Sequence, residues 1–415
     1  MNVVQKQERK NAIGNFAMSS FWAISTLFVN TFLVAQIFIL SNQNITLTAG
    51  FMLVKYTLLF AFNVITSILM AKGVSAIWIS RVSAIGAFVF IIVISAMPDI
   101  LITHTILLGA AWGIISGLYW GPSTYLVVKI YKREHTKTFF TIKQLTILGI
   151  QVIFPFTFGA LIDFGSMVIT SILVGIIVAL QLLTSFMIKI DQGDKRKLQM
   201  LGFFRAAKKK KFLKPIISYN GLTVLSGINS TIALAIVMVI ILSMGTHFSL
   251  GAITSIISVV GMIIVASYKL IKEKRLRIAI FMVAAIIPFL GSLSLMISFG
   301  AISIIIFNFA SAFKRIMFLE KNTETHNLPK YWGDQEFILE SNLLIKFAIY
   351  VGRAITFGLL ILVGTFSNPE YWLIILINLM LFAFAFQAMW FYEWKLKYKP
   401  KHDQQVGNTT ITSTT

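Results

Sequence analysis

Apolar stretches long enough to cross a lipid bilayer recur along nearly the whole chain. The hydrocarbon core of a bilayer is about 30 Å thick, and a helix needs about 20 mostly apolar residues to cross it. The pattern predicts twelve spans, at residues 12–40, 47–70, 76–97, 101–130, 138–161, 167–190, 214–243, 249–271, 277–298, 301–320, 336–364 and 370–393. Of the 415 residues, 57% are hydrophobic and only 12% are charged, so we expect an all-α polytopic membrane protein without a soluble domain.

The placement of basic residues predicts the orientation of these spans. The alternate connections at 41–47, 96–104, 244–250 and 363–371 contain no Lys or Arg, whereas the intervening ones are rich in both. Lys and Arg collect in the cytoplasmic loops of membrane proteins. We therefore expect both termini in the cytoplasm and the protein in the cytoplasmic membrane. The net charge of +21 then faces anionic lipid headgroups, and no nucleic-acid partner is needed to explain it.

The basic segment at 191–213 divides the chain into two parts of six spans each. It predicts an N-terminal bundle at 1–190, a C-terminal bundle at 214–399 and a polar, disordered tail at 400–415. Apolar residues alternate with basic ones in this segment, which fits either a short helix on the membrane surface or a solvated linker. TFGALI at 157–162 and TFGLLI at 356–361 occupy the fifth span of each part, which indicates a duplicated unit.

The sequence offers little for enzyme chemistry. It has no cysteine, which removes disulfides, thiolate metal sites and cysteine nucleophiles. No two of its histidines have the i, i+3 or i+4 spacing of a metal pair on one helix: they are His104, His135, His247, His326 and His402. A membrane enzyme would also need clustered carboxylates or a nucleophile with its base. We expect a protein that is not an enzyme and uses no metal or cofactor.

Twelve spans, a basic central loop and a six-plus-six repeat together resemble a permease of the major facilitator superfamily. This resemblance implies two six-helix bundles around a central cavity and transport by alternating access. The loop ILMAKGVSAIWISR (68–81) keeps the glycine and basic residues of the family signature but lacks its aspartate, so no gating residue is transferred. The segment at 336–358 resembles a Gly-Arg helix of some uncharacterised permeases of low-GC Gram-positive bacteria.

Drug exporters of the superfamily tend to carry a Gly-Pro pair and paired glycines in span five. Here that span reads GIQVIFPFTFGALI (149–162), with Pro155 and Gly159 but without those pairs. A multidrug exporter is therefore disfavoured.

Three cations are expected at membrane depth: Lys55 in span two, and Lys346 and Arg353 in span eleven. A charge at the centre of a membrane helix costs at least about 2.5–3.5 kcal/mol, so such residues usually face the protein interior. The resemblance implies that both spans line the cavity, where Lys55 and Arg353 would face one another as an anion-binding pair. Alternatively, Lys55 extends to the membrane boundary while Arg353 caps carbonyls or pairs with a buried acid.

Other polar and aromatic residues are weaker candidates for the same site. Asn30 and Trp22 belong to a polar stripe along span one, and Tyr350 lies near Arg353. In span four, Gly109, Gly113, Gly117 and Gly121 recur every fourth residue, which permits close approach of a neighbouring helix. The adjoining flank of that span carries Trp112, Ser116 and Tyr119, which suit the wall of a partly wet pocket.

Carboxylates at depth are scarcer than cations. Asp163 and Glu340 are the candidates for coupling transport to H⁺, and the alternative is that both are ordinary charges at helix ends. The excess of cations favours an anionic or amphiphilic solute as the small-molecule substrate. The sequence therefore predicts a secondary transporter; a carrier of lipids or lipid-linked headgroups and a non-transporting sensor or assembly subunit remain as alternatives.

Overall fold

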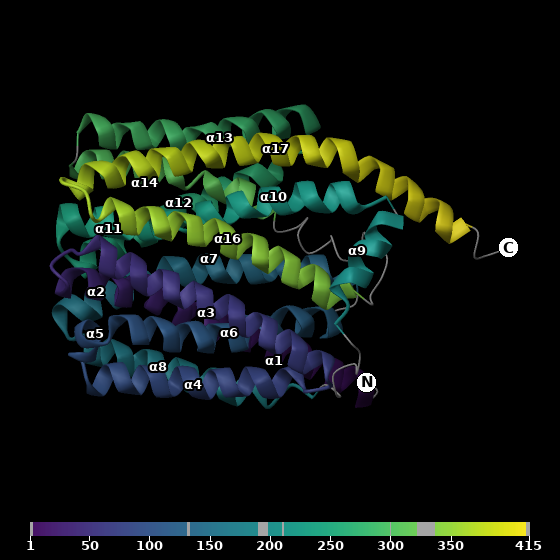
Figure 1. Ribbon diagram of the computed structural model, residues 1–415, viewed down its shortest axis with the longest axis horizontal. Helices are drawn as coiled ribbons and strands as arrows, with labels where there is room; N and C mark the ends of the chain where they lie inside the picture. Colours follow the sequence, from purple (N-terminus) through teal and green to yellow (C-terminus); the bar gives the residue numbers. More distant parts are fainter. Residues whose placement is uncertain are drawn as a thin grey trace.

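The computed structural model describes residues 3–130, 133–189, 198–209, 211–298, 300–321 and 337–411, and in this part of the chain it contains helices and no strands (Figure 1). The N-terminal helices are α1 (Val3–Leu27), the π-helix η1 (Phe28–Leu33), α2 (Val34–Leu40), α3 (Ile45–Ala71), α4 (Ala76–Ala96), α5 (Ile100–Thr103), α6 (Thr105–Ile130), α7 (Arg133–Phe164) and α8 (Met167–Ser185). The predicted all-α class is confirmed.

The C-terminal helices follow a short helix in the basic central segment. They are α9 (Met200–Lys209), α10 (Leu213–Ser230), α11 (Ile232–Met244), α12 (His247–Leu270), α13 (Lys274–Ile297), α14 (Ala301–Ser311), α16 (Ile338–Val363) and α17 (Pro369–Ile411). After a turn, α14 continues as a helix over 314–321. Residues 191–197 of the central segment lie outside the described residues, and the position of α9 at a membrane surface stays a prediction.

Eleven helical segments of the described chain are long and apolar enough to cross a membrane. The span predicted at 101–130 is not among them, although α6 fills most of it with 26 residues. Its glycines, Trp112, Tyr119, Trp120 and Pro122 make α6 less hydrophobic than its neighbours. The chain is thus an integral multi-pass membrane protein, while the count of twelve spans in two repeats stays a prediction.

The helices form two groups that meet mainly where α3 and α7 of the first group pack against α16 and α12 of the second. Helices α1 to α8 pack among themselves, and so do α10 to α17. Between the groups, α3 packs against α16, α7 against α12, and α2 against α11. Figure 1 shows α2 beside α11 at one end of the molecule, whereas α9 and both chain ends lie at the other. The site described below lies on the contact between α3 and α16.

The four glycines of α6 hold that helix against α3. A Cβ atom at Gly109 would lie 2.6 Å from the carbonyl oxygen of Phe51, and one at Gly117 would lie 2.8 Å from that of Leu59. Gly113 lies against the backbone of Lys55 in the same way. Only glycine permits this approach, so the glycine pattern is confirmed as a packing surface. It fixes the backbone of α3 where α3 carries Lys55.

The last helix extends further than the sequence predicts. The backbone of α17 is helical to Ile411, whereas a disordered tail was expected from residue 400. The other predicted bundle boundaries stay predictions.

Candidate functional site

The contact between α3 and α16 keeps one antiparallel register along its length. Near one end, the Thr46 hydroxyl donates to the carbonyl of Ile361 at 3.3 Å. About three turns along α3, Thr57 Oγ1 lies 3.4 Å from Tyr350 Oη. Because the pairs advance along α3 as they recede along α16, residues near the middle of both helices meet at the same depth.

Tyr56 lies at that depth between two cations. Lys55 Nζ is 4.6 Å from the centre of the Tyr56 ring, and Arg353 Cζ is 4.1 Å from it. Phe357 stacks on the same ring, with centroids 5.5 Å apart and planes inclined by 11°. Each cation over an aromatic face gains about 0.5–2 kcal/mol, more when the pair is removed from water. The predicted meeting of Lys55 and Arg353 is therefore present, with Tyr56 between them.

The hydrogen-bond partners of the two cations are neutral. Lys55 Nζ donates to Asn30 Oδ1 on η1 and lies 3.4 Å from Met52 Sδ. Arg353 Nε donates to Ser230 Oγ, the last residue of α10, at 2.8 Å. Asn30 lies within a π-helical turn, a distortion that is frequent at functional sites. Four elements from both groups of helices thus contribute to one cluster.

The cluster carries positive charge without an acidic partner. Lys55 is only 2% exposed, and no carboxylate of the described residues forms an ion pair with Lys55 or Arg353. Buried charges in proteins are normally paired. We name Asn30, Lys55, Tyr56, Ser230 and Arg353 the cation cluster. Its chemistry suits an anionic group that supplies the missing negative charge.

Lys346 lies further along the same contact and is engaged differently. Its Nζ donates to Asn63 Oδ1 at 3.2 Å and to the carbonyl of Trp120 at 2.8 Å, which ties α16 to α3 and α6. Tyr350, one turn away, stacks on Phe60 with ring centroids 5.0 Å apart. These contacts give both residues a place in helix packing, and their predicted part in binding stays a prediction.

The aromatic flank predicted on span four is buried. Trp22 stacks on Tyr119 at 4.1 Å and on Trp112 at 5.6 Å between centroids. The three side chains are 2%, 1% and 0% exposed, and Ser116 is buried with them. Because α1 packs over this flank of α6, it forms core instead of the partly wet wall that the sequence suggested. No ring contact in the described chain joins these residues to the cation cluster.

The two candidate carboxylates lie away from the cation cluster. Asp163, near the end of α7, accepts a hydrogen bond from the backbone N–H of Phe248 at 2.6 Å and lies 3.1 Å from His247 Nδ1. It thereby caps the first turn of α12, where a negative charge is favourable. Glu340 is buried and accepts a bond from the backbone N–H of Gln199 at 3.0 Å. A role in coupling stays a prediction for both.

Sequence reasoning missed two residues that the structure makes prominent. Tyr56 belongs to the cation cluster, and buried Lys321 donates a hydrogen bond to Ser226 of α10. Lys321 was set aside as a flanking charge because it ends a span. The signal available for Tyr56 was its position directly after an intramembrane lysine. Among the described residues there is no group of three or more His, Asp or Glu side chains that could hold a metal ion. The side chains of His135, His326 and His402 lie outside the described part of the chain.

Comparison with known proteins identifies the fold. No family model and no curated protein matches the sequence. Among solved structures, the chain is similar to a bacterial homologue of the iron transporter ferroportin in an inward-facing state, with 15% identity, a TM-score of 0.62 and 95% and 99% of the two chains covered. It is also similar to the POT family transporter PepTSo, with 11% identity, a TM-score of 0.68 and 94% and 99% covered.

A third similar structure, the nucleoside transporter NupG, has 12% identity, a TM-score of 0.61 and 96% and 100% coverage. Identities this low establish the shared fold and leave substrate and mechanism open. The resemblance to low-GC Gram-positive permeases stays a prediction. At the level of the fold the predicted resemblance is confirmed, and the chain has the fold of the major facilitator transporters.

Proposed function

We propose that the protein is a secondary transporter that moves a small anionic solute across the cytoplasmic membrane by alternating access. The observation that carries this proposal is the cation cluster, in which Lys55 and Arg353 share the Tyr56 ring without a carboxylate of the described chain. A buried charge needs a partner, and an anionic ligand is the partner that can arrive and leave.

The strength of such binding suits a transported ligand. An anionic group about 4 Å from a cation gains about 4 kcal/mol at an effective dielectric of 20. Part of this gain is offset by removing the anion from water. Two cations therefore support recognition that is specific without being too tight for release.

The position of the cluster supports alternating access. Asn30 and Lys55 come from the N-terminal helices, whereas Ser230 and Arg353 come from the C-terminal ones. Rocking of the two groups would change the distance between the two cations and hence the affinity for an anion. We further propose that the end where α2 packs against α11 faces outward, because the loops there lack Lys and Arg. Coupling to H⁺ through Asp163 or Glu340 belongs to the same proposal.

Counterflow in proteoliposomes tests this function. Purified protein is reconstituted, loaded with one unlabelled solute at a time, and assayed for uptake of the same labelled solute from a panel of carboxylates, phosphates, short-chain lipid phosphates and matched cations. We expect exchange of an anion and none of the cations. Exchange of the lipid phosphate alone would favour the lipid-headgroup carrier, and binding without any exchange would favour a sensor.

Variants connect the exchange to the cluster. Arg353→Ala and Lys55→Met should abolish it, whereas Arg353→Lys should retain part because the charge persists. Arg81→Gln is the matched control, since Arg81 donates to the carbonyl of Ser185 at 3.2 Å on the contact between α4 and α8, away from the cluster. Full exchange by Arg353→Ala would remove Arg353 from the site.

A further inference from the structure

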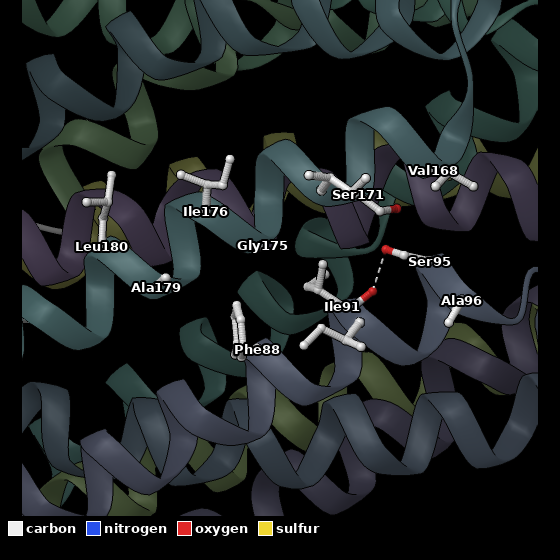
Figure 2. Close-up of a pocket in the computed structure, with 12 residues that line it drawn as sticks. Phe88, Ile91, Ser95, Ala96, Val168, Ser171, Gly175, Ile176, Ala179 and Leu180 are labelled. Carbon is white, nitrogen blue, oxygen red and sulfur yellow. Dashed lines mark hydrogen bonds between the residues drawn. The ribbon is translucent and has the colours of Figure 1, made fainter.

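A second candidate site lies in a groove between α4 and α8, among the N-terminal helices. The groove has a volume of about 610 Å³, within the range of about 300–1,000 Å³ typical of ligand sites. Ile91, Ser171 and Gly175 are buried and form its floor, while Ile92, Ile172 and Ile176 are exposed along its rim (Figure 2). The structure therefore presents a slot that opens away from the interior.

The groove runs along the membrane-spanning part of both helices. Along α8 it extends from Val168, next to the start of the helix, to Leu180. Twelve residues of helix rise about 18 Å, a little over half of the about 30 Å bilayer core. Because α4 and α8 are both membrane spans, the exposed rim faces lipid chains. An occupant can enter sideways from the bilayer.

The two ends of the groove differ in polarity. The hydroxyls of Ser95 and Ser171 lie toward the end that Ala96 and Val168 close, and Leu180 and Phe88 line the other (Figure 2). Ser95 Oγ is already satisfied, since it donates to the carbonyl of Ile91 at 2.7 Å. Ser171 is 0% exposed, and within the described residues its Oγ has no hydrogen-bond partner. Buried polar groups are normally hydrogen-bonded, so the Ser171 hydroxyl would be satisfied by donating a hydrogen bond to a molecule bound in the groove.

The shape of the groove favours a lipid chain over a protein helix. The groove is apolar and long, with about 610 Å³ distributed along about 18 Å, and its rim lies on two membrane spans. A partner helix, about 10 Å across, would rest on the rim side chains and leave the buried floor unfilled. A single flexible hydrocarbon chain would fill it, and its polar end would meet the serine end.

We propose that this groove binds one acyl chain of a bilayer phospholipid, with an ester carbonyl accepting a hydrogen bond from Ser171 Oγ. The lipid is a resident of the N-terminal helices. It lies apart from the cation cluster, whose helices α3 and α16 do not line the groove. The proposal is therefore independent of the proposed transport function.

Photocrosslinking tests the site in the full chain. The protein is reconstituted into vesicles that contain a phosphatidylglycerol with a diazirine in one acyl chain, irradiated, digested and analysed by mass spectrometry. We expect labelling of 88–96 and 168–180 above that of equally exposed segments such as 302–306 of α14. Equal labelling of all lipid-facing segments would show surface lipid only and would overturn the proposal.

Two blocking variants and one control separate occupancy from surface contact. Ala179→Phe and Ala96→Phe place a ring near the Leu180 end and at the serine end of the groove, and each should reduce its labelling to the level of 302–306. Ile169→Phe makes the same kind of addition on α8 at a side chain that is 52% exposed and outside the groove, and it should leave the labelling unchanged. Unchanged labelling in both blocking variants would contradict the proposal.

Ser171→Ala tests the polar end with a smaller change. A probe with its diazirine next to the ester carbonyl should label 168–172 strongly in the parent protein. In Ser171→Ala that labelling should fall while labelling by the chain-end probe persists. Recovery of a crosslinked protein in place of lipid would overturn the acyl-chain assignment. Thermal unfolding of each variant confirms that it is folded.

Discussion

The two long contacts between the N-terminal and C-terminal helices are built in opposite ways. Where α7 meets α12, backbone lies against backbone. Gly251 lies against the carbonyl of Pro155, and a Cβ atom there would be 3.3 Å from the Cα of Gly159. Hydrogen bonds cross this contact directly, such as the one from the backbone N–H of Phe156 to Ser255 Oγ at 3.0 Å. Such close packing leaves no room for a solute.

Along the middle of the contact between α3 and α16, long side chains lie between the helices, although Gly364 approaches the backbone of Thr46 at one end. Tyr56 and Phe60 stack against Phe357 and Tyr350, and the cations Lys55 and Arg353 share a ring. The two contacts therefore differ in their role. The close contact between α7 and α12 holds the two groups of helices together, and the charged contact between α3 and α16 carries the residues suited to bind an anion. A site on one of the two contacts needs only that contact to be adapted for binding.

The sharpest test of the close contact between α7 and α12 is the addition of one methyl group there. Gly251→Ala would place a methyl group against the backbone of Pro155, which cannot move aside as a side chain can. Overpacking of this kind costs about 1–3 kcal/mol. We expect Gly251→Ala to lower the free energy of unfolding by that amount, measured by denaturant titration in mixed micelles.

Gly358→Ala is the matched control on α16, because no atom lies within 4 Å of a Cβ built at Gly358. Replacing a helical glycine by alanine without strain gains about 0.5–1 kcal/mol. The two variants should therefore shift stability in opposite directions. Because Gly358 is exposed, this variant reports the effect of the substitution without packing. A shift of Gly251→Ala in the same direction as that of Gly358→Ala would mean that the contact at Gly251 is not close and would break the comparison.

The next effect concerns the ring between the two cations. Tyr56→Leu keeps apolar bulk but removes two cation–aromatic contacts, each worth about 0.5–1 kcal/mol or more when desolvated. We expect a loss of about 1–2 kcal/mol in the free energy of unfolding and weaker anion exchange. Tyr56→Phe keeps the ring and should behave as the parent protein. If Tyr56→Leu matched Tyr56→Phe, the ring would have no part in holding the cations.

The cation cluster also shows which parts of the site could be predicted from the sequence. Hydropathy and charge predicted that Lys55 and Arg353 lie at membrane depth and turn toward the protein interior, because a charge in contact with lipid is costly. That the two residues face one another was implied by the family resemblance. Tyr56 was not predicted. Helical periodicity gives the direction in which a side chain points from its own helix, but it does not say which residues of a second helix lie opposite. That register depends on the crossing of α3 and α16.

The stacked aromatics of α6 show a different limit. Trp112 and Tyr119 were expected beside a wet pocket because tryptophan and tyrosine combine a ring with a polar group. In the structure they are buried under Trp22 of α1. The same residue pattern fits both environments, and only the packing of a distant helix decides between them. The glycine pattern on α6 was predictable because close approach has a single physical cause.

A moderate effect is expected at the end of the close contact. Asp163→Ala removes the carboxylate that accepts the Phe248 N–H and caps α12 from the neighbouring helix. Loss of a capping acceptor costs about 1 kcal/mol. Thr246→Ala is a useful comparison, since Thr246 is the N-cap residue of α12 itself. Its hydroxyl oxygen accepts a hydrogen bond from the backbone N–H of Ser249 at 3.1 Å. Only Asp163→Ala should also loosen α7 from α12, measured by hydrogen exchange at the start of α12.

The smallest effect is expected at Lys346, although it is a cation on the charged contact. Lys346 is half-buried, and its contacts with Asn63 and the Trp120 carbonyl belong to helix packing, whereas the two cations of the cation cluster share the Tyr56 ring. The hydrogen bonds lost in Lys346→Met are offset by the cost of keeping a charge out of water, which the variant removes. We expect Lys346→Met to change the free energy of unfolding by less than about 1 kcal/mol and to leave anion exchange intact, measured by the same titration and counterflow. Loss of exchange in Lys346→Met would extend the cation cluster along α16 and place a third positive charge in the site.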